Sequence, residues 1–127
     1  MKALLDTHTF LWAITEDPRL SRRARQMYTS SNDLWLSVAS VWEILIKARV
    51  GKLPLPDPVG PYLTKELAKN RIEVLPITLD HVLKTEALPL HHRDPFDRLL
   101  IAQGIEEGWP ILTADPWFAR YPVQVIW

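Results

Sequence analysis

The sequence contains no cysteine, and this absence excludes two classes of protein. A scaffold held by disulfides and a zinc site built from thiolates both need cysteine side chains. Hydrophobic runs are also short, and none approaches the ~20 residues of a membrane-spanning helix. An acid already stands at position 6, too early for the hydrophobic core of a signal peptide. We therefore expect a cytoplasmic protein with no membrane partner.

Neither sign of charge is in excess, because 15 basic residues balance 15 acidic ones. Net charge therefore gives no argument for a nucleic-acid partner. If four acids bind a metal ion, 15 basic residues face the remaining 11 acids, which leaves +4. Basic side chains gather between Arg19 and Arg25 and again between Lys47 and Lys52. Such groups occur on solvated helix faces as well as on phosphate-binding surfaces, so both interpretations stay open.

Short hydrophobic runs alternate with helical patterns along the 127 residues. We predict strands at 2–5, 34–36, 73–75, 111–112 and 123–126. We predict helices at about 7–13, 22–29, 38–50, 62–70, 80–88 and 96–107, with a loop at 30–33 and an extended connector at 53–58. Strands that alternate with helices are typical of an α/β layer fold with a parallel sheet. The length fits one domain, and no repeat divides the chain, so we expect a single domain over 1–127.

Acids follow two of the predicted strands directly. Asp6 ends the first strand run, and Asp115 follows the run Pro110-Ile111-Leu112-Thr113. Ligands of open parallel sheets bind at the carboxyl ends of the strands, so these two acids are expected to share a site. Glu43 and Asp97 lie in helices that begin at the same edge. Four carboxylates raise each other's pKa unless a cation lies among them, and Mg²⁺ or Mn²⁺ suits such an all-oxygen environment.

Each acid also has a structural interpretation. Asp6 can cap the helix that it precedes, and Asp94 and Asp115 each precede a proline, as in an N-cap followed by proline at the first helical position. Asp97 lies in a first helical turn, where negative charge is favourable. Glu43 stands four residues before a lysine, the spacing of a surface ion pair, and off the centre of its helix's apolar stripe. No single acid decides between the interpretations, whereas their common location favours a shared site.

The histidines give a weaker signal. His8 follows the first acid closely and could orient it or make a structural hydrogen bond. His91 and His92 stand near Asp94 and Asp97, which suggests a metal cluster. Adjacent histidines before a turn are, however, typical of exposed positions, and no third soft ligand accompanies them. We therefore do not include histidine in the predicted site.

Four motifs occur in an order that resembles a PIN-domain nuclease. They are Leu4–His8, Ser37–Ile44, Asp94–Ala102 and Leu112–Asp115. The segment 47–55 also resembles the VapC-like toxins of bacterial type II toxin–antitoxin pairs, and the likeness covers essentially the whole chain. The resemblance implies a three-layer α/β/α domain around a mainly parallel sheet of about five strands. It also implies an endoribonuclease that depends on Mg²⁺ or Mn²⁺ and leaves a 5′-phosphate and a 3′-hydroxyl.

The resemblance also implies roles for individual residues. Four acids match the catalytic and metal-binding positions, and two further residues match secondary ones; they are Asp6, Glu43, Asp97 and Asp115, with Asp94 and Thr113 as the secondary candidates. Glu43 would bind metal directly, or position or deprotonate the attacking water. A toxin of this kind acts on RNA, has a cognate antitoxin protein that covers the acidic site, and usually forms a homodimer.

Other functions stay open at this stage. An RNA-processing PIN nuclease would share the site but have no antitoxin. A non-catalytic binding module would use its acids to hold a structural metal or to cap helices. A phosphatase that works through a phosphoaspartate would want a second aspartate two residues after the first, where His8 stands.

Overall fold

The computed structural model describes residues 1–30 and 33–127, so part of the predicted loop at 30–33 lies outside the described residues. Its five strands form one sheet in the order β3-β2-β1-β4-β5, and every neighbouring pair is parallel. The strands are β1 (Lys2–Leu5), β2 (Asp33–Ser37), β3 (Glu73–Leu75), β4 (Ile111–Leu112) and β5 (Val125–Ile126). The predicted α/β class and parallel sheet are confirmed.

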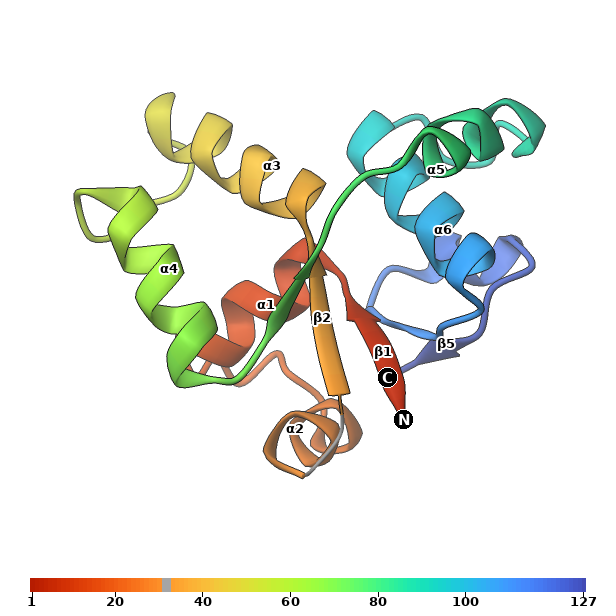
Figure 1. Cartoon of the computed structure of the whole chain (residues 1–127). Helices are drawn as coiled ribbons and strands as arrows, with labels where there is room; N and C mark the ends of the chain where they lie inside the picture. Colours follow the sequence, from red (N-terminus) through yellow and green to blue (C-terminus); the bar gives the residue numbers. More distant parts are fainter. Residues whose placement is uncertain (31–32) are drawn as a thin grey trace.

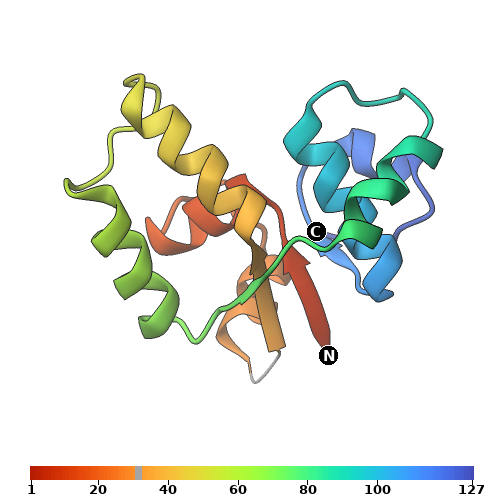
Figure 2. The same ribbon diagram turned by 45° about the horizontal axis from the view of Figure 1, so that its top comes forward.

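Helices connect the strands and cover both faces of the sheet (Figures 1 and 2). The helices are α1 (Thr7–Ile14), α2 (Arg22–Thr29), α3 (Val38–Arg49), α4 (Val59–Lys69), α5 (Leu79–Lys84) and α6 (Pro95–Glu107), with the 3₁₀ helices η1 (Thr85–Ala87) and η2 (Pro116–Arg120). Helices α1, α3 and α4 lie on one side, and α5 and α6 lie on the other, which gives the three layers expected. Within the described residues, no helix is long and apolar enough to span a membrane.

Three boundaries differ from the sequence-based expectation. The helix expected at 62–70 begins at Val59, with Pro58 at its N-cap. The helix expected at 80–88 ends at Lys84 and continues as the 3₁₀ turn η1, a common way to tighten a helix end. The last strand is shorter than 123–126, because Val123 still belongs to a turn in which its N–H donates to the carbonyl of Tyr121. None of these shifts moves an acid of the predicted site.

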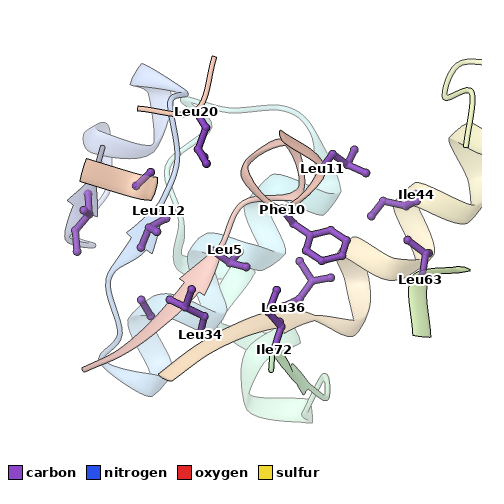
Figure 3. Packing of buried hydrophobic residues seen from close by; sticks show 13 residues of the cluster. Leu5, Phe10, Leu11, Leu20, Leu34, Leu36, Ile44, Leu63, Ile72 and Leu112 are labelled. Atoms are coloured by element: carbon purple, nitrogen blue, oxygen red, sulfur yellow. The ribbon is translucent and has the colours of Figure 1, made fainter. Parts of the chain in front are cut away.

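The alternation of side chains along β1 builds two separate cores. Ala3 and Leu5 point into one cluster, around Phe10, and Leu4 points into the other, around Leu100. Figure 3 shows the first cluster, to which α1, α3 and α4 contribute. These side chains are fully buried, and the burial of each leucine or phenylalanine among them stabilises the fold by roughly 1.5–3 kcal/mol. The two cores hold the helices firmly on either face and so fix where their N-terminal ends lie.

The sheet order creates a switch point beside β1. The chain passes from β1 to β2 and β3 on one side and then returns to place β4 on the other side of β1. Because all strands are parallel, the carboxyl ends of β1, β2 and β4 lie at one edge, where α1, α3 and η2 begin. Ligands of doubly wound sheets bind at such a point. The fold thus directs attention to the residues that follow β1 and β4.

Candidate metal centre

Asp6 lies at the end of β1 and is almost completely buried, with 4% of its surface exposed. It occupies the N-cap position of α1, but in the described structure its side chain makes no capping hydrogen bond. Its Oδ2 instead accepts a hydrogen bond from the hydroxyl of Thr113, at 2.8 Å, across the switch point from β1 to β4. Burial raises the pKa of Asp6. The capping interpretation is therefore wrong for Asp6, and Thr113 orients its carboxylate.

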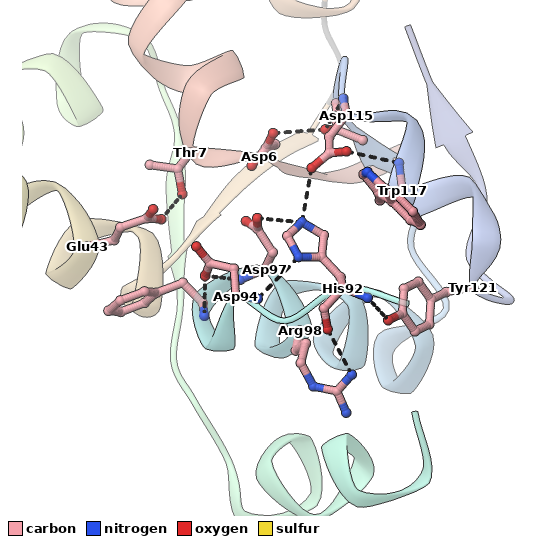
Figure 4. A network of polar contacts seen from close by, with 12 residues as sticks. Asp6, Thr7, Glu43, His92, Asp94, Asp97, Arg98, Asp115, Trp117 and Tyr121 are labelled. Atoms are coloured by element: carbon pink, nitrogen blue, oxygen red, sulfur yellow. Dashed lines mark hydrogen bonds and ion pairs between the residues drawn. The ribbon is translucent and has the colours of Figure 1, made fainter. Parts of the chain in front are cut away.

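Asp97 lies in the first turn of α6 and faces the same region (Figure 4). Burial, together with the nearby charges of Asp6, Asp94, Glu43 and Asp115, raises the pKa of Asp97 to about 8. Burial is the largest of these causes, and the charges act because their carboxylates lie near Asp97. Acids from four distant segments thus lie within electrostatic range of Asp97, at the edge to which the switch-point argument assigned them.

Asp94 and Asp115 both cap helices, but only one of them also faces the centre of the site. Asp94 Oδ1 accepts hydrogen bonds from the backbone N–H groups of Phe96, at 2.8 Å, and Asp97, at 3.2 Å. Asp115 Oδ1 accepts a hydrogen bond from the N–H of Trp117, at 2.9 Å. Its Oδ2 contacts His92, and the same ring nitrogen of His92 contacts Asp97. The structural interpretation thus accounts for Asp94, whereas Asp115 fits both interpretations.

Glu43 lies on the buried side of α3, with 3% of its surface exposed. Its Oε1 is 2.9 Å from the hydroxyl of Thr7, and its Oε2 is 2.7 Å from Nζ of Lys47. The ion pair expected from the sequence exists, but its carboxylate is buried and only its lysine reaches the surface. Lys47 and Thr7 together fix both oxygens of a carboxylate that lies deep beside the start of α1.

The apolar stripe of α3 is not its buried face. The buried residues of this helix are Ala39, Ser40, Glu43 and Ile44, while four of its large apolar side chains are exposed, namely Val38, Trp42, Leu45 and Ile46. The small residues allow α3 to approach α1, where the hydroxyls of Ser40 and Thr7 lie 2.8 Å apart. A helical wheel centred on the large apolar residues therefore placed Glu43 away from the core, although it points inward.

His92 is the site residue that sequence reasoning missed. Its Nε2 lies 2.9 Å from Oδ2 of Asp97 and 3.1 Å from Oδ2 of Asp115, and the ligand atoms of these three residues lie within 4.8 Å of one another. The available signal was its position two residues before the Asp94 cap. The other candidates differ: His91 is exposed, and the exposed His8 acts on Asp6 only through its charge, which lowers the pKa of that carboxyl.

The donor set fits a hard divalent cation. The centre is rich in carboxylates, and each of the four principal acids has at least one oxygen oriented by a hydrogen bond or ion pair. An oxygen that accepts one hydrogen bond keeps a second lone pair for a metal ion. Burial is the largest cause of the raised pKa of both Asp6 and Asp97, neighbouring carboxylates add to it, and a bound cation would favour the charged form of each. Mg²⁺ and Mn²⁺ match such an oxygen-rich centre.

Several basic residues of the chain do not face this centre freely. Lys47 pairs with Glu43. Helix α2, which carries Arg22 and Arg23, lies at the opposite end of the sheet from the starts of α3 and α6 (Figure 1). The guanidinium of Arg98 donates to four backbone carbonyls, those of Thr85, Leu88, Pro89 and His92, at 2.9–3.2 Å. Arg98 is thus a structural residue that holds the segment before α6.

We expect Arg98→Ala to destabilise the protein by about 2–4 kcal/mol, because several hydrogen bonds from a charged group are lost and their carbonyl partners are left unsatisfied. Urea denaturation measures this change, and amide exchange should accelerate in residues 85–92. Arg93→Ala is the matched control, since Arg93 is exposed and its removal should change stability by no more than about 0.5 kcal/mol. Equal effects of the two substitutions would contradict the role given to Arg98.

The fold and the acidic centre together are typical of one class of protein, and sequence comparison identifies that class. Residues 3–124 match the PIN domain, so the chain belongs to the PIN domain family. It is 34% identical over 113 residues to ribonuclease VapC22 of Mycobacterium tuberculosis, a match that covers 88% of this chain and 85% of that protein. Ribonuclease VapC16 of the same organism is 42% identical over 50 residues, which are 39% of this chain and 34% of that one.

Solved structures share the fold at lower sequence identity. A chain of VapBC2 from Rickettsia felis, bound to a DNA fragment from its promoter, superposes with a TM-score of 0.74 at 18% identity over 99% of this chain and 98% of that one. A chain of FitAcB from Neisseria gonorrhoeae gives a TM-score of 0.68 at 18% identity, with 98% and 96% covered. These likenesses show that the whole chain adopts the same fold.

Proposed function

We propose that this protein is a metal-dependent endoribonuclease and the toxin of a type II toxin–antitoxin pair, acting in the cytoplasm. One observation carries the proposal: four acids from separate segments, Asp6, Glu43, Asp97 and Asp115, converge at the switch point of a PIN fold. Similarity to ribonuclease VapC22 over most of both chains supports the activity. The fold shared with VapBC2 supports the assignment to a toxin–antitoxin pair.

The residues divide the chemistry between them. Asp6, Asp97 and Asp115 would hold one or two Mg²⁺ or Mn²⁺ ions, which when bound lower the pKa of a coordinated water and neutralise charge on the phosphoryl oxygens. Thr113 keeps the carboxylate of Asp6 directed toward the centre. Glu43, held by Thr7 and Lys47, positions the attacking water or accepts its proton. Asp94 contributes by capping α6, and so fixes the turn that carries Asp97.

The direct test is cleavage of total RNA by the purified chain, with Mg²⁺ or Mn²⁺ against EDTA. We expect discrete fragments only with metal, and fragment ends that ligate as 5′-phosphates and 3′-hydroxyls. Asp6→Asn should give no fragments, whereas Asp80→Asn, at an exposed position on α5, should cleave like the wild type. Cleavage that persists in EDTA, or in folded Asp6→Asn, would refute the assignment of this site.

Growth separates a toxin from the other functions that a PIN fold can serve. Induced expression in a bacterial host should arrest growth for the wild type but not for Asp6→Asn, and co-expression of the protein encoded beside it should restore growth. Cleavage in vitro without growth arrest would indicate an RNA-processing nuclease instead. Metal binding with neither effect would indicate a non-catalytic module.

The exposed apolar side chains of α3 and α5 supply surface for the proposed protein partners. They are Val38, Trp42, Leu45 and Ile46 on α3, with Val50 at its C-cap, and Leu79, Val82 and Leu83 on α5, each at least 38% exposed. Contiguous apolar surface on a globular protein marks sites of association. We propose a homodimer and an antitoxin complex on such surfaces. Sedimentation equilibrium should give the mass of a dimer for the toxin alone, and a monomer mass would remove the homodimer from the proposal.

A further inference from the structure

The imidazole of His92 lies between two of the four acids (Figure 4). Its Nε2 is 2.9 Å from one oxygen of Asp97 and 3.1 Å from one oxygen of Asp115. Asp97 belongs to the first turn of α6, and Asp115 to the turn after β4, so the ring bridges two elements that no strand pairing joins. A short contact between a carboxyl oxygen and a ring nitrogen needs a proton between the two atoms. The contacts of the second ring nitrogen indicate whether His92 supplies it.

The second ring nitrogen fixes the tautomer. Nδ1 of His92 accepts a hydrogen bond from the backbone N–H of Asp94, at 3.3 Å. A nitrogen that accepts a hydrogen bond carries no proton, so in the neutral ring the proton is on Nε2. We assign this tautomer from the backbone donor, which can act in no other way. Nε2–H therefore donates toward the carboxylates of both Asp97 and Asp115.

Several contacts hold the ring and its backbone in place. The N–H of His92 donates to the hydroxyl of Tyr121, at 2.8 Å, and its carbonyl accepts from the guanidinium of Arg98, at 3.2 Å. The ring packs edge-on against Phe118, with centroids 5.9 Å apart and planes at 84°. Phe118 is fully buried and Tyr121 nearly so. The position of His92 is thus set by the core beneath η2 and not by the acids alone.

We propose that His92 is a positioning residue, whose Nε2–H holds the carboxylates of Asp97 and Asp115 together to receive the divalent cation. This inference rests on the proposed function. A role as a direct ligand would require a bare Nε2, and in a neutral ring the proton would then move to Nδ1 and break its hydrogen bond with Asp94. The geometry therefore makes His92 a hydrogen-bond donor to the ligands, in the way that outer residues orient carboxylates around metals.

Metal affinity tests the role of His92 without a measurement of activity. In calorimetric titration with Mn²⁺, His92→Ala should bind about 10–100-fold more weakly than the wild type, the usual cost of losing such an outer partner. His92→Gln should recover most of the affinity, because its amide N–H can reach the place of Nε2–H. His91→Gln, at the exposed neighbour, should bind like the wild type. Unchanged affinity in His92→Ala would overturn the proposal, as would a glutamine variant no better than alanine.

The tautomer can be observed in the unaltered protein, so the proposal does not depend on how the variants fold. Long-range ¹H–¹⁵N spectra of labelled protein should show a protonated Nε2 on His92, both without metal and at saturating Mg²⁺. Loss of that proton on metal binding would identify His92 as a ligand and overturn the proposal. Wild type that binds no metal and cleaves no RNA would overturn the proposed function as well. Tight binding by the wild type, with His92→Ala unchanged, would overturn the positioning role alone.

Discussion

Asp97→Asn should abolish RNA cleavage and leave the fold intact. The amide has the shape of the carboxylate, and its oxygen can still accept from His92, but the negative charge that a cation needs is gone. Loss of one group that stabilises the transition state electrostatically costs about 10²–10³ in rate, and loss of a metal ligand at least as much. Initial cleavage rates with saturating Mn²⁺ measure the effect, and the far-UV circular dichroism spectrum checks the fold.

Asp94→Asn is the matched control for this prediction. Asp94 lies three residues before Asp97 and acts by capping α6, and asparagine caps helices as well as aspartate does. The control should therefore retain most of the wild-type rate. A folded Asp97→Asn with full activity, or an Asp94→Asn as inactive as Asp97→Asn, would contradict the division of roles between these two acids.

Asp97→Asn should also stabilise the metal-free protein. Burial and the neighbouring carboxylates raise the pKa of Asp97 from 3.8 in its unperturbed state to about 8 in the fold. Between these values the folded protein holds a proton that the unfolded chain releases, so stability falls as the pH rises through this window. Asparagine does not ionise, so the variant does not lose stability in this way as the pH rises. In EDTA at pH 8, Asp97→Asn should melt about 5–10 °C above the wild type, as expected if ~2 kcal/mol of the repulsion is relieved.

The pH dependence provides the control. The difference in Tm between Asp97→Asn and the wild type should shrink as the pH is lowered from 8 toward 4, because the destabilisation from the raised pKa of Asp97 almost vanishes as the pH approaches the unfolded value of 3.8. Added Mn²⁺ should raise the Tm of the wild type more than that of the variant, because the ion binds the folded state and neutralises the crowded charge. A difference in Tm that does not change with pH, or a less stable variant at pH 8, would show that Asp97 is not a source of repulsion.

The sequence predicted those parts of the site that depend on strand ends. Four of the five strands lie within one residue of the expected ranges, the fifth starts two residues later, and Asp6 follows β1 as the pattern required. Because a parallel sheet brings strand ends to one edge, the meeting of Asp6 and Asp115 needed no knowledge of side-chain packing. Thr113 could be named as a secondary candidate only through the family resemblance, and its 2.8 Å hydrogen bond to Asp6 supplies a physical reason.

The sequence could not predict the features that depend on tertiary packing. His92 belongs to the site because Tyr121, Phe118 and Arg98 fix its segment, and none of these contacts appears in local spacing. The burial of Glu43 was missed because a helical wheel assumes that the largest apolar residues face the core. In α3 the small residues Ala39 and Ser40 face the core beside Glu43 and Ile44, whereas most of the large apolar residues remain on the surface. That inversion is what brings a carboxylate inward and leaves apolar surface for a partner.

The most direct test of the central claim is a crystal of the wild-type chain soaked in Mn²⁺, with anomalous diffraction recorded. A peak bounded by carboxylate oxygens of Asp6, Asp97 and Asp115 is the predicted result, with His92 beside the acids and not bound to the ion. The same soak of Asp6→Asn should give no peak there. If the protein cleaves RNA but the ion binds elsewhere, with no peak among these acids, the result would contradict the account.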